Sequence, residues 1–240
     1  MALNFASLDG NASDTADDNI VTASVTLANN NIDILIVGVI QETGANPNVP
    51  AVSGWTEIGN VLFSDGASFN GRLIGYRRLG AGGTGTHDIN TSGQTNHAWL
   101  YELIQSADND ISGTNGSGAI TQFNTNNDNS GSSDAPATTL GDFADPEADQ
   151  ALIVAILCGS PTTAISPEPA NDFTQRDTTS YSLRVSWGLN EDLTPSGSLA
   201  AARPWAILAI EVKRAAGGLN VALTEVTVPV SPQTLSPLQN

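Results

Sequence analysis

One seven-residue apolar run occurs twice in this chain. The first copy is Ile34–Ile40 (ILIVGVI) and the second is Ala151–Leu157 (ALIVAIL), and a repeat of this kind constrains the fold before any single residue does. Each run is apolar at every position, contains β-branched residues and is short for a helix, which indicates a strand covered on both faces. We therefore predict two equivalent halves, each organised around one central strand.

The same order of short motifs follows each run, roughly 110 to 118 residues apart. The first set is Pro50, Gly54-Trp55-Thr56, the strand-like Arg72–Leu79 and Trp99–Ile104. The second set is Pro167 with Pro169, Asp172-Phe173-Thr174, Tyr181–Leu189 and Ala206–Val212. This order places the halves at about residues 20–105 and 135–214 of one β-sandwich domain that spans residues 1–216.

Alternation along the strands predicts which side chains face the core. In Tyr181–Leu189 the large apolar residues, Leu183, Val185 and Trp187 among them, alternate with small or polar ones such as Ser186. Strict alternation is typical of a strand with one buried face. We expect Leu183 to face inward and Ser186 to lie on the opposite face.

The two closing strands each contain one glutamate among apolar residues. In Trp99–Ile104, Glu102 lies on the face opposite to the aromatic side chains, and in Ala206–Val212, Glu211 lies opposite to Ile210 and its apolar neighbours. We expect Glu102 and Glu211 to occupy the same outward face of the two halves.

Three segments have weaker patterns. Residues 1–19 are polar and acidic, and we expect a loose lead-in. Ile20–Leu27 alternates, which predicts a strand with Val21, Ala23, Val25 and Leu27 on one face. Residues 105–150 are rich in Asn, Asp, Ser and Gly, and we expect a long loop with a short strand at Ala119–Phe123.

Charge and composition exclude several classes of protein. The chain has a formal net charge of −17, so it has no basic face for the phosphates of nucleic acid or for an anionic membrane. Cys158 is the only cysteine, which rules out an intrachain disulfide and fits a small buried side chain. The first residues have no basic and apolar signal-peptide pattern, so we expect synthesis and folding in a cytoplasm.

Candidate sites are few. His87 and His97 lie near turns, with no serine in a nucleophile-elbow setting, and we expect solvated loop histidines and no enzyme activity. The segment from Asp108 to Gly113 matches the first half of a calcium loop, but Ala119 stands where the bidentate glutamate belongs. Asp108 and Asp110 are therefore only weak calcium ligands, and no cofactor is expected.

The aromatic residues could form either the core or a platform for stacking sugars. They are Trp55, Tyr76, Trp99, Trp187 and Trp205. Their recurrence in both halves favours the core, because a duplicated half-sandwich repeats its core positions. Among the five, Trp205, which follows a proline and whose facing the pattern leaves open, is the first candidate for an exposed position.

The chain after Gly217-Gly218 differs from the rest. Three prolines exclude a central strand there, and its apolar residues alternate with polar ones. We predict that residues 217–240 form an extended arm that binds a partner through Leu219, Val221, Leu223, Val226, Val228 and Val230.

Taken together, these motifs resemble a family of repeated β-sandwich units found in bacteriophage virion proteins and in some large bacterial surface proteins. The family pattern is an apolar strand, a proline loop, a Gly-Trp-Thr-like step, a strand with an aromatic and a basic residue, and a closing strand, all repeated. Here the aromatic and basic step is Tyr76-Arg77 in the first half and Trp187 in the second, and Phe173 replaces the tryptophan of the Gly-Trp-Thr step.

The resemblance implies an all-β fold, a single antiparallel jelly-roll-like sandwich of two duplicated halves, and a structural role without catalytic residues. We expect a virion protein made in the host cytoplasm, either a capsid decoration or cement protein or a head or tail fibre component. Its expected partners are the major capsid protein, another virion protein and further copies of itself. The alternative is a carbohydrate-binding or adhesive module on a phage tail or a bacterial surface.

Overall fold

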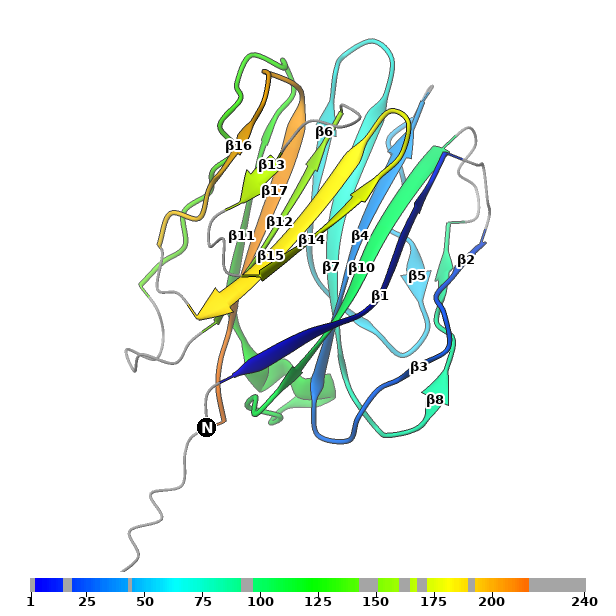
Figure 1. Cartoon of the computed structure of the whole chain (residues 1–240), viewed down its shortest axis with the longest axis vertical. Helices are drawn as coiled ribbons and strands as arrows, with labels where there is room; N and C mark the ends of the chain where they lie inside the picture. Colours follow the sequence, from blue (N-terminus) through cyan, green and yellow to red (C-terminus); the bar gives the residue numbers. More distant parts are fainter. Residues whose placement is uncertain are drawn as a thin grey trace, which may run out of the picture.

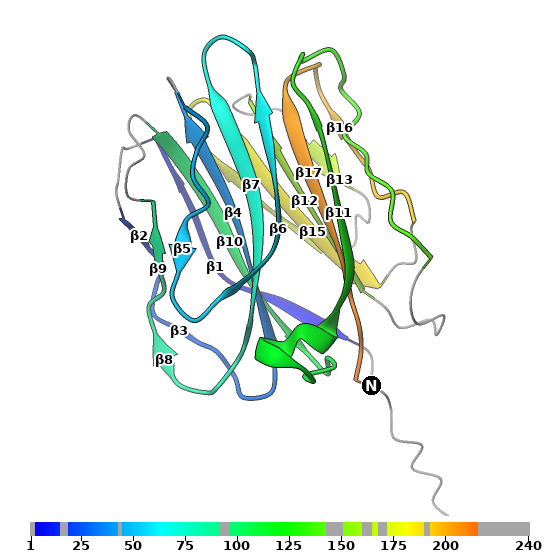
Figure 2. The same cartoon turned by 180° about the vertical axis from the view of Figure 1, so that it is seen from behind.

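The computed structural model describes residues 3–14, 19–42, 45–91, 97–142, 151–159, 165–167, 172–189 and 193–215. Within these ranges the protein is built almost entirely from β-strands, with one short 3-10 helix, η1 (Thr114–Ala119). The two principal sheets, which pack against each other, contain five strands each, and all their pairings are antiparallel (Figures 1 and 2).

The first sheet has the order β1-β10-β4-β7-β6 and the second has the order β11-β17-β12-β15-β14. The strands of the first are β1 (Asn4–Ser13), β4 (Ile32–Gln41), β6 (Thr56–Ser64), β7 (Asn70–Leu79) and β10 (His97–Ala107). Those of the second are β11 (Ile120–Asp128), β12 (Ala151–Cys158), β14 (Asp172–Asp177), β15 (Ser182–Leu189) and β17 (Trp205–Val212).

The predicted duplication is confirmed by this strand order. The two repeated apolar runs form β4 and β12, and each is the central strand of its sheet. Along the chain, each sheet begins with an edge strand (β1 or β11), followed by the central strand (β4 or β12). A hairpin then forms one side of the sheet (β6 and β7, or β14 and β15), and the last strand (β10 or β17) lies on the other side, between the central and the edge strand. Each half thus builds one complete sheet, and two similar antiparallel halves make the sandwich.

The main core lies between the two sheets. Alternate residues of β4, including Ile34 and Ile36, pack there against Ile153 of β12 and against Leu183 and Val185 of β15. All five side chains are essentially inaccessible to solvent. The predicted inward face of Tyr181–Leu189 is therefore confirmed for its described side chains, and burying this much apolar surface provides the main driving force for folding.

Each sheet is also covered on its outer face. On the first sheet the cover consists of short strands at one side of the molecule (Figure 2): β2 (Asn19–Val21), β3 (Val25–Thr26), β5 (Ala51–Val52), β8 (Thr84–Gly85) and β9 (Asp88–Asn90). On the second sheet it consists of β13 (Ile165–Pro167), β16 (Gly197–Leu199) and residues 134–140, whose backbone bonds to residues 193–199. This covering explains why the repeated runs are apolar on both faces.

Leu183→Ala is expected to lower the free energy of unfolding by about 2 to 5 kcal/mol, because it leaves a cavity between the sheets. Ser186→Ala on the other face of β15 removes only a long hydrogen bond, 3.4 Å from Ser186 Oγ to the Val154 carbonyl, and is expected to cost about 1 kcal/mol or less. Urea denaturation of both variants provides the measurement. Equal losses would show that the two faces of β15 are not distinguished as described.

Side chains connect the two sheets at each of the two seams where the sheet edges meet. At one seam β6 lies beside β11, where Asn127 donates a 2.8 Å hydrogen bond to the Leu62 carbonyl and the Ser64 N–H donates to Asn129. At the other seam β1 lies beside β14. There Arg176 Nε donates to Glu102 Oε2 at 2.8 Å, and the side chain of Glu102 has no exposed surface.

The placement of Glu102 corrects the prediction for the two glutamates. Glu102 points into the space between the sheets, on the same face of β10 as Leu100 and Ile104, whereas Glu211 lies on the outer face of β17. Both carboxylates are buried. Alternation could not reveal this difference, because both faces of each sheet are covered.

Two strands are longer than the sequence pattern predicts. Residues 4–13, expected as a lead-in, form β1, which pairs with β10 along its whole length. The short strand expected at Ala119–Phe123 begins one residue later and extends through Asp128 as β11. The polar side chains of β11 are used as hydrogen-bond donors: Asn124 and Asn126 donate to the carbonyls of Thr139 and Ala137.

Two further predictions are wrong in detail. The expected strand Ile20–Leu27 is broken into β2 and β3, so that Ile20 is buried while Val21 is 49% exposed. Trp205, the first candidate for an exposed position, is only 3% exposed and packs under the outer cover of the second sheet. The general assignment of the aromatic residues to the core is confirmed for Tyr76, Trp99, Trp187 and Trp205, and Trp55 is partly buried.

Candidate functional site

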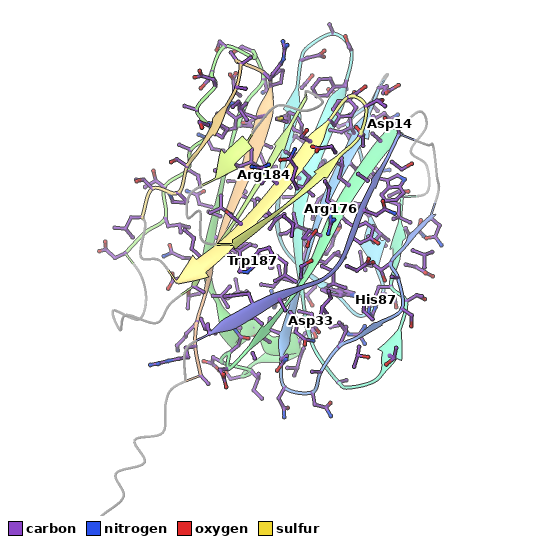
Figure 3. All side chains as sticks on the ribbon, viewed as in Figure 1. Asp14, Asp33, His87, Arg176, Arg184 and Trp187 are labelled. Carbon is purple, nitrogen blue, oxygen red and sulfur yellow. The ribbon has the colours of Figure 1, made fainter. Side chains whose placement is uncertain are left out.

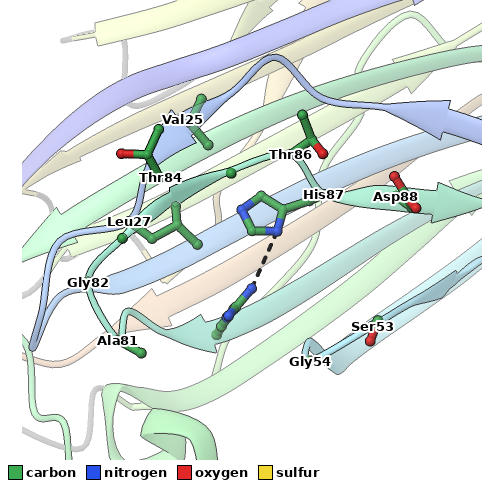
Figure 4. Close-up of a pocket in the computed structure, with 13 residues that line it drawn as sticks. Val25, Leu27, Ser53, Gly54, Ala81, Gly82, Thr84, Thr86, His87 and Asp88 are labelled. Atoms are coloured by element: carbon green, nitrogen blue, oxygen red, sulfur yellow. Dashed lines mark hydrogen bonds between the residues drawn. The ribbon is translucent and has the colours of Figure 1, made fainter.

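A polar pocket of about 510 Å³ lies between the first sheet and its outer cover. Its lining comes from the end of β7, the glycine-rich turn that follows, the start of β9 and the turn at Ser53 and Gly54 (Figure 4). Arg78 and His87 are the basic residues of the lining, and Val25 and Leu27 form an apolar wall. We call this hollow the Arg78 pocket.

The glycine-rich turn has its shape because two segments approach each other closely. A Cβ atom on Gly80 would stand 2.1 Å from the Ala28 carbonyl oxygen, so only glycine fits there. Gly82 has a φ of 71°, in the left-handed region that glycine favours. The turn is fixed to the connection between β3 and β4 by the hydrogen bond from Gly80 N–H to the Asn31 carbonyl, 2.9 Å long.

Arg78 and His87 are in direct contact. Arg78 NH1 lies 3.3 Å from His87 Nδ1, and because a guanidinium is always a donor, Nδ1 must accept and the ring proton must reside on Nε2. Burial lowers the pKa of His87, and the positive charge of Arg78 lowers it further, against an opposite effect of Asp88. His87 is therefore neutral at pH 7.

Trp55 also contacts the imidazole ring of His87. Its ring packs edge-on against the imidazole, with centroids 5.6 Å apart. His87 is half-buried and its Nε2 is enclosed without a hydrogen-bond partner. The expectation that His87 is a solvated loop histidine is therefore wrong. The side chain of His97 lies outside the described part of the chain.

A buried acid lies behind Arg78. Asp33 of β4 is paired in register with Arg78 of β7 and has no exposed surface. Its Oδ1 accepts a 2.8 Å hydrogen bond from Gln105, while Oδ2 has no partner. Burial raises the pKa of Asp33 to about 7, and Gln105 and the charge of Arg78 only partly oppose this rise (Figure 3 shows Asp33 and His87).

The chemistry of the Arg78 pocket depends on the contact between Arg78 and His87. A neutral imidazole oriented by a guanidinium differs from a catalytic dyad, in which the ring accepts from a nucleophile and donates to a carboxylate. What the pocket does offer is a cation, several hydroxyl groups and an apolar wall. Arg78 and His87 are both visible in the sequence, but nothing in the sequence shows that they meet.

The weak calcium candidates lie elsewhere, at the end of β10. Asp110 Oδ2 is 3.5 Å from the ammonium of Lys213, and Asp110 also accepts from the Ser112 N–H. Hydrogen bonds from Ser112 and the charge of Lys213 hold the pKa of Asp110 below its usual range. Among the described residues, no three His, Cys, Asp or Glu side chains gather closely enough to hold a metal ion.

Comparison with known proteins found no family model, no curated protein and no solved structure that matches this chain. In the described part of the chain, no helix has the length and the apolar character needed to cross a membrane. The segment predicted to form a partner-binding arm, with Leu219, Val221, Leu223, Val226, Val228 and Val230, lies outside the described residues.

Proposed function

We propose that this protein is a non-enzymatic structural protein of a tailed-phage virion, most simply a decoration or cement protein that binds the outer surface of the capsid. The observation that best supports this role is that the described chain starts and ends at the same end of the sandwich (Figure 1). Asn4 pairs with Ala107, and the Ala215 N–H donates a 2.7 Å hydrogen bond to the carbonyl of Asp108.

This arrangement gives the molecule two functionally different ends. The arm, residues 217–240, follows directly from the end at which Ala215 is fixed, while the β6–β7 hairpin lies at the opposite end (Figure 1). A protein attached through its arm would therefore present the hairpin end outward. An arm adds contact area, and many equivalent attachments on a lattice increase the apparent affinity.

The arm is also suited to strand addition. Its alternating apolar residues would pair with the edge of a partner sheet, where backbone hydrogen bonds give affinity and side-chain pockets give selectivity. The partner is the major capsid protein, another virion protein or a second copy of this chain. We also propose that the sandwich is related to the jelly-roll-like units of virion proteins. The two similar antiparallel halves support this relation.

We expect a chain that ends at Ala216 to fold with a nearly unchanged melting temperature but to lose binding to virus particles and self-association. The described structure supports folding, because every strand and the Ala215–Asp108 hydrogen bond remain. Thermal melts, light scattering and co-sedimentation with particles provide the measurements.

Two results would contradict the proposal. A truncated chain that still decorates particles at full occupancy would show that the arm is not the anchor. Failure to find the full-length protein in purified particles, by mass spectrometry and cryo-electron microscopy, would remove the virion assignment itself.

The second candidate is a carbohydrate-binding or adhesive module on a phage tail or a bacterial surface. One specific observation favours it, namely the polar Arg78 pocket under the outer cover of the first sheet.

A further inference from the structure

A second hollow adjoins the Arg78 pocket. This hollow, of about 460 Å³, is lined by Asn19, Ala51, Val52, Ser53, Asp88 and Asn90. Ser53 and Asp88 line both spaces, so the two hollows lie side by side, from the glycine-rich turn to Asn90 of β9. Together we call them the β9 groove.

The cationic end of the β9 groove is pre-organised. Arg78 is held by His87 on one side. On another side the guanidinium carbon lies 3.7 Å from the position that a Cβ atom on Gly54 would occupy, so the group lies against a bare stretch of backbone. An arginine fixed in this way offers its remaining donors as a planar fork, which matches the geometry of a carboxylate.

The charge of the whole protein restricts which anion is suitable. With a net charge of −17, the chain repels anions, and a doubly charged phosphate is repelled more strongly than a singly charged carboxylate. Asp88 adds a negative charge where the two hollows meet. The ligand should therefore carry one carboxylate at its Arg78 end and be uncharged at the other end.

The rest of the groove suits hydroxyl groups and C–H faces. Thr84, Thr86 and Ser53 are among its lining residues, Asp88 lies where the two hollows meet, and Asn19 and Asn90 lie at the far end. Val25, Leu27 and Val52 provide apolar surface beside these polar groups. Few convergent polar groups on an apolar wall are typical of a small-ligand site, and a sugar ring has the matching alternation of hydroxyl edges and apolar faces.

We propose that the β9 groove binds an acidic saccharide, with the sugar carboxylate on Arg78 and the sugar hydroxyls toward Ser53, Asp88 and the asparagine amides. This ligand site does not depend on the virion assignment, because it uses only the described sandwich and not the arm. Loss of particle binding and loss of saccharide binding are therefore separable results.

The test is a titration of the full-length protein with glucuronate, N-acetylneuraminate, glucose and inorganic phosphate. Binding is monitored by NMR at the Trp55 indole and His87 ring signals. We expect at least one acidic sugar to bind at least about tenfold more tightly than glucose, since a hydrogen bond to a charged group contributes about 1.5 to 3 kcal/mol. No binding of either acidic sugar would overturn the proposal. Phosphate binding as tight as the sugar would also overturn it, by showing a simple anion site.

Two substitutions locate the site. Arg78→Gln should weaken the binding of the acidic sugar by about tenfold or more, whereas Arg203→Gln removes the same charge at an exposed position outside the groove and should leave the affinity unchanged. Equal losses for these two variants would contradict the proposal.

Gly85→Val provides an independent probe that leaves Arg78 intact. Gly85 lines the Arg78 pocket, its φ is not in the left-handed region, and a Cβ atom there would meet no atom within 4 Å. The valine side chain should therefore fill the groove without disturbing the fold, and it should block the sugar while the melting temperature is retained. Unchanged affinity in a folded Gly85→Val protein would show that the ligand binds elsewhere.

Discussion

Replacing Arg176 with alanine is expected to lower the free energy of unfolding at pH 7 by at most about 3 to 5 kcal/mol, the range for removing one partner of a fully buried ion pair. Arg176, labelled in Figure 3, belongs to β14 and contacts Glu102 of β10 across the seam. The Glu102 side chain has no exposed surface, whereas that of Arg176 is 29% exposed. The hydroxyl of Ser7 donates to the other carboxylate oxygen. Without the guanidinium, the carboxylate would remain buried between the sheets with its charge uncompensated.

The pH dependence identifies the cause of this loss. Burial raises the pKa of Glu102, and hydrogen bonds from Ser7 and Arg176 together with the charge of Arg176 oppose the rise. Removing Arg176 should raise this pKa further. The variant should then lose less stability at acidic pH, where Glu102 becomes protonated and its burial costs less. Urea denaturation at pH 5 and pH 7 measures this difference.

Two controls accompany the Arg176 variant. Arg203→Ala removes an exposed arginine and should change the stability little. Gly10→Ala should reproduce part of the loss, because a Cβ atom on Gly10 would stand 2.3 Å from both Arg176 Nε and Glu102 Oε2. An Arg176→Ala protein as stable as the Arg203→Ala protein would show that the pair is solvated and does not connect the sheets.

The central strands were predictable from the sequence because each has to be covered on both faces. Ile34–Ile40 and Ala151–Leu157 could not be stable anywhere except in the middle of a sheet with layers on either side. What could not be predicted is which face meets the other sheet. Leu103 and Ile104 are equally buried on opposite faces of β10, so periodicity gives the alternation but not its direction.

The edge strands were hidden for a different reason. β1 and β11 are held mainly by backbone pairing with β10 and β17, and neither has the apolar pattern that marks a half-buried strand. In β11 the amides that suggested a loop bind the backbone of residues 137–141: Gln122 both donates to and accepts from Gly141. An asparagine-rich sequence thus forms an ordered edge when its amides have backbone partners.

The Arg78 pocket could be foreseen only in part. Arg78, His87 and the glycine-rich turn are all visible in the sequence, and alternation places Arg78 on a definite face of its strand. The contact between Arg78 and His87 depends on the path of the turn between them, which Gly80 permits by its close approach to Ala28. Asp33 was indistinguishable from a surface residue at the start of an apolar run, because its burial depends on the cover that packs over it.

Asp33→Asn is expected to stabilise the protein at neutral pH by up to about 4 kcal/mol and to change little at pH 4. Asp33 has its pKa raised from 3.8 to about 7 by burial, so the folded state binds this proton more tightly than the unfolded state. The stabilisation that accompanies the proton is complete below about pH 4 and is lost as the pH rises to about 7. One pKa unit corresponds to about 1.4 kcal/mol. The rise in the pKa of Asp33 from 3.8 to about 7 therefore sets the upper limit of the stabilisation at about 4 kcal/mol.

The measurement is the difference in unfolding free energy between the Asp33→Asn and wild-type proteins, from urea denaturation between pH 4 and pH 8. Glu102 also has a raised pKa, but it is present in both proteins and its contribution cancels in the difference. Because an asparagine side chain resembles a protonated aspartate in shape, the curve should rise from near zero at pH 4 and level off above pH 7. A curve that stays flat over this range would mean that Asp33 titrates alike in the folded and unfolded chains. A negative difference at pH 8 would mean that the Asp33 carboxylate contributes more to the stability through Arg78 and Gln105 than its burial costs.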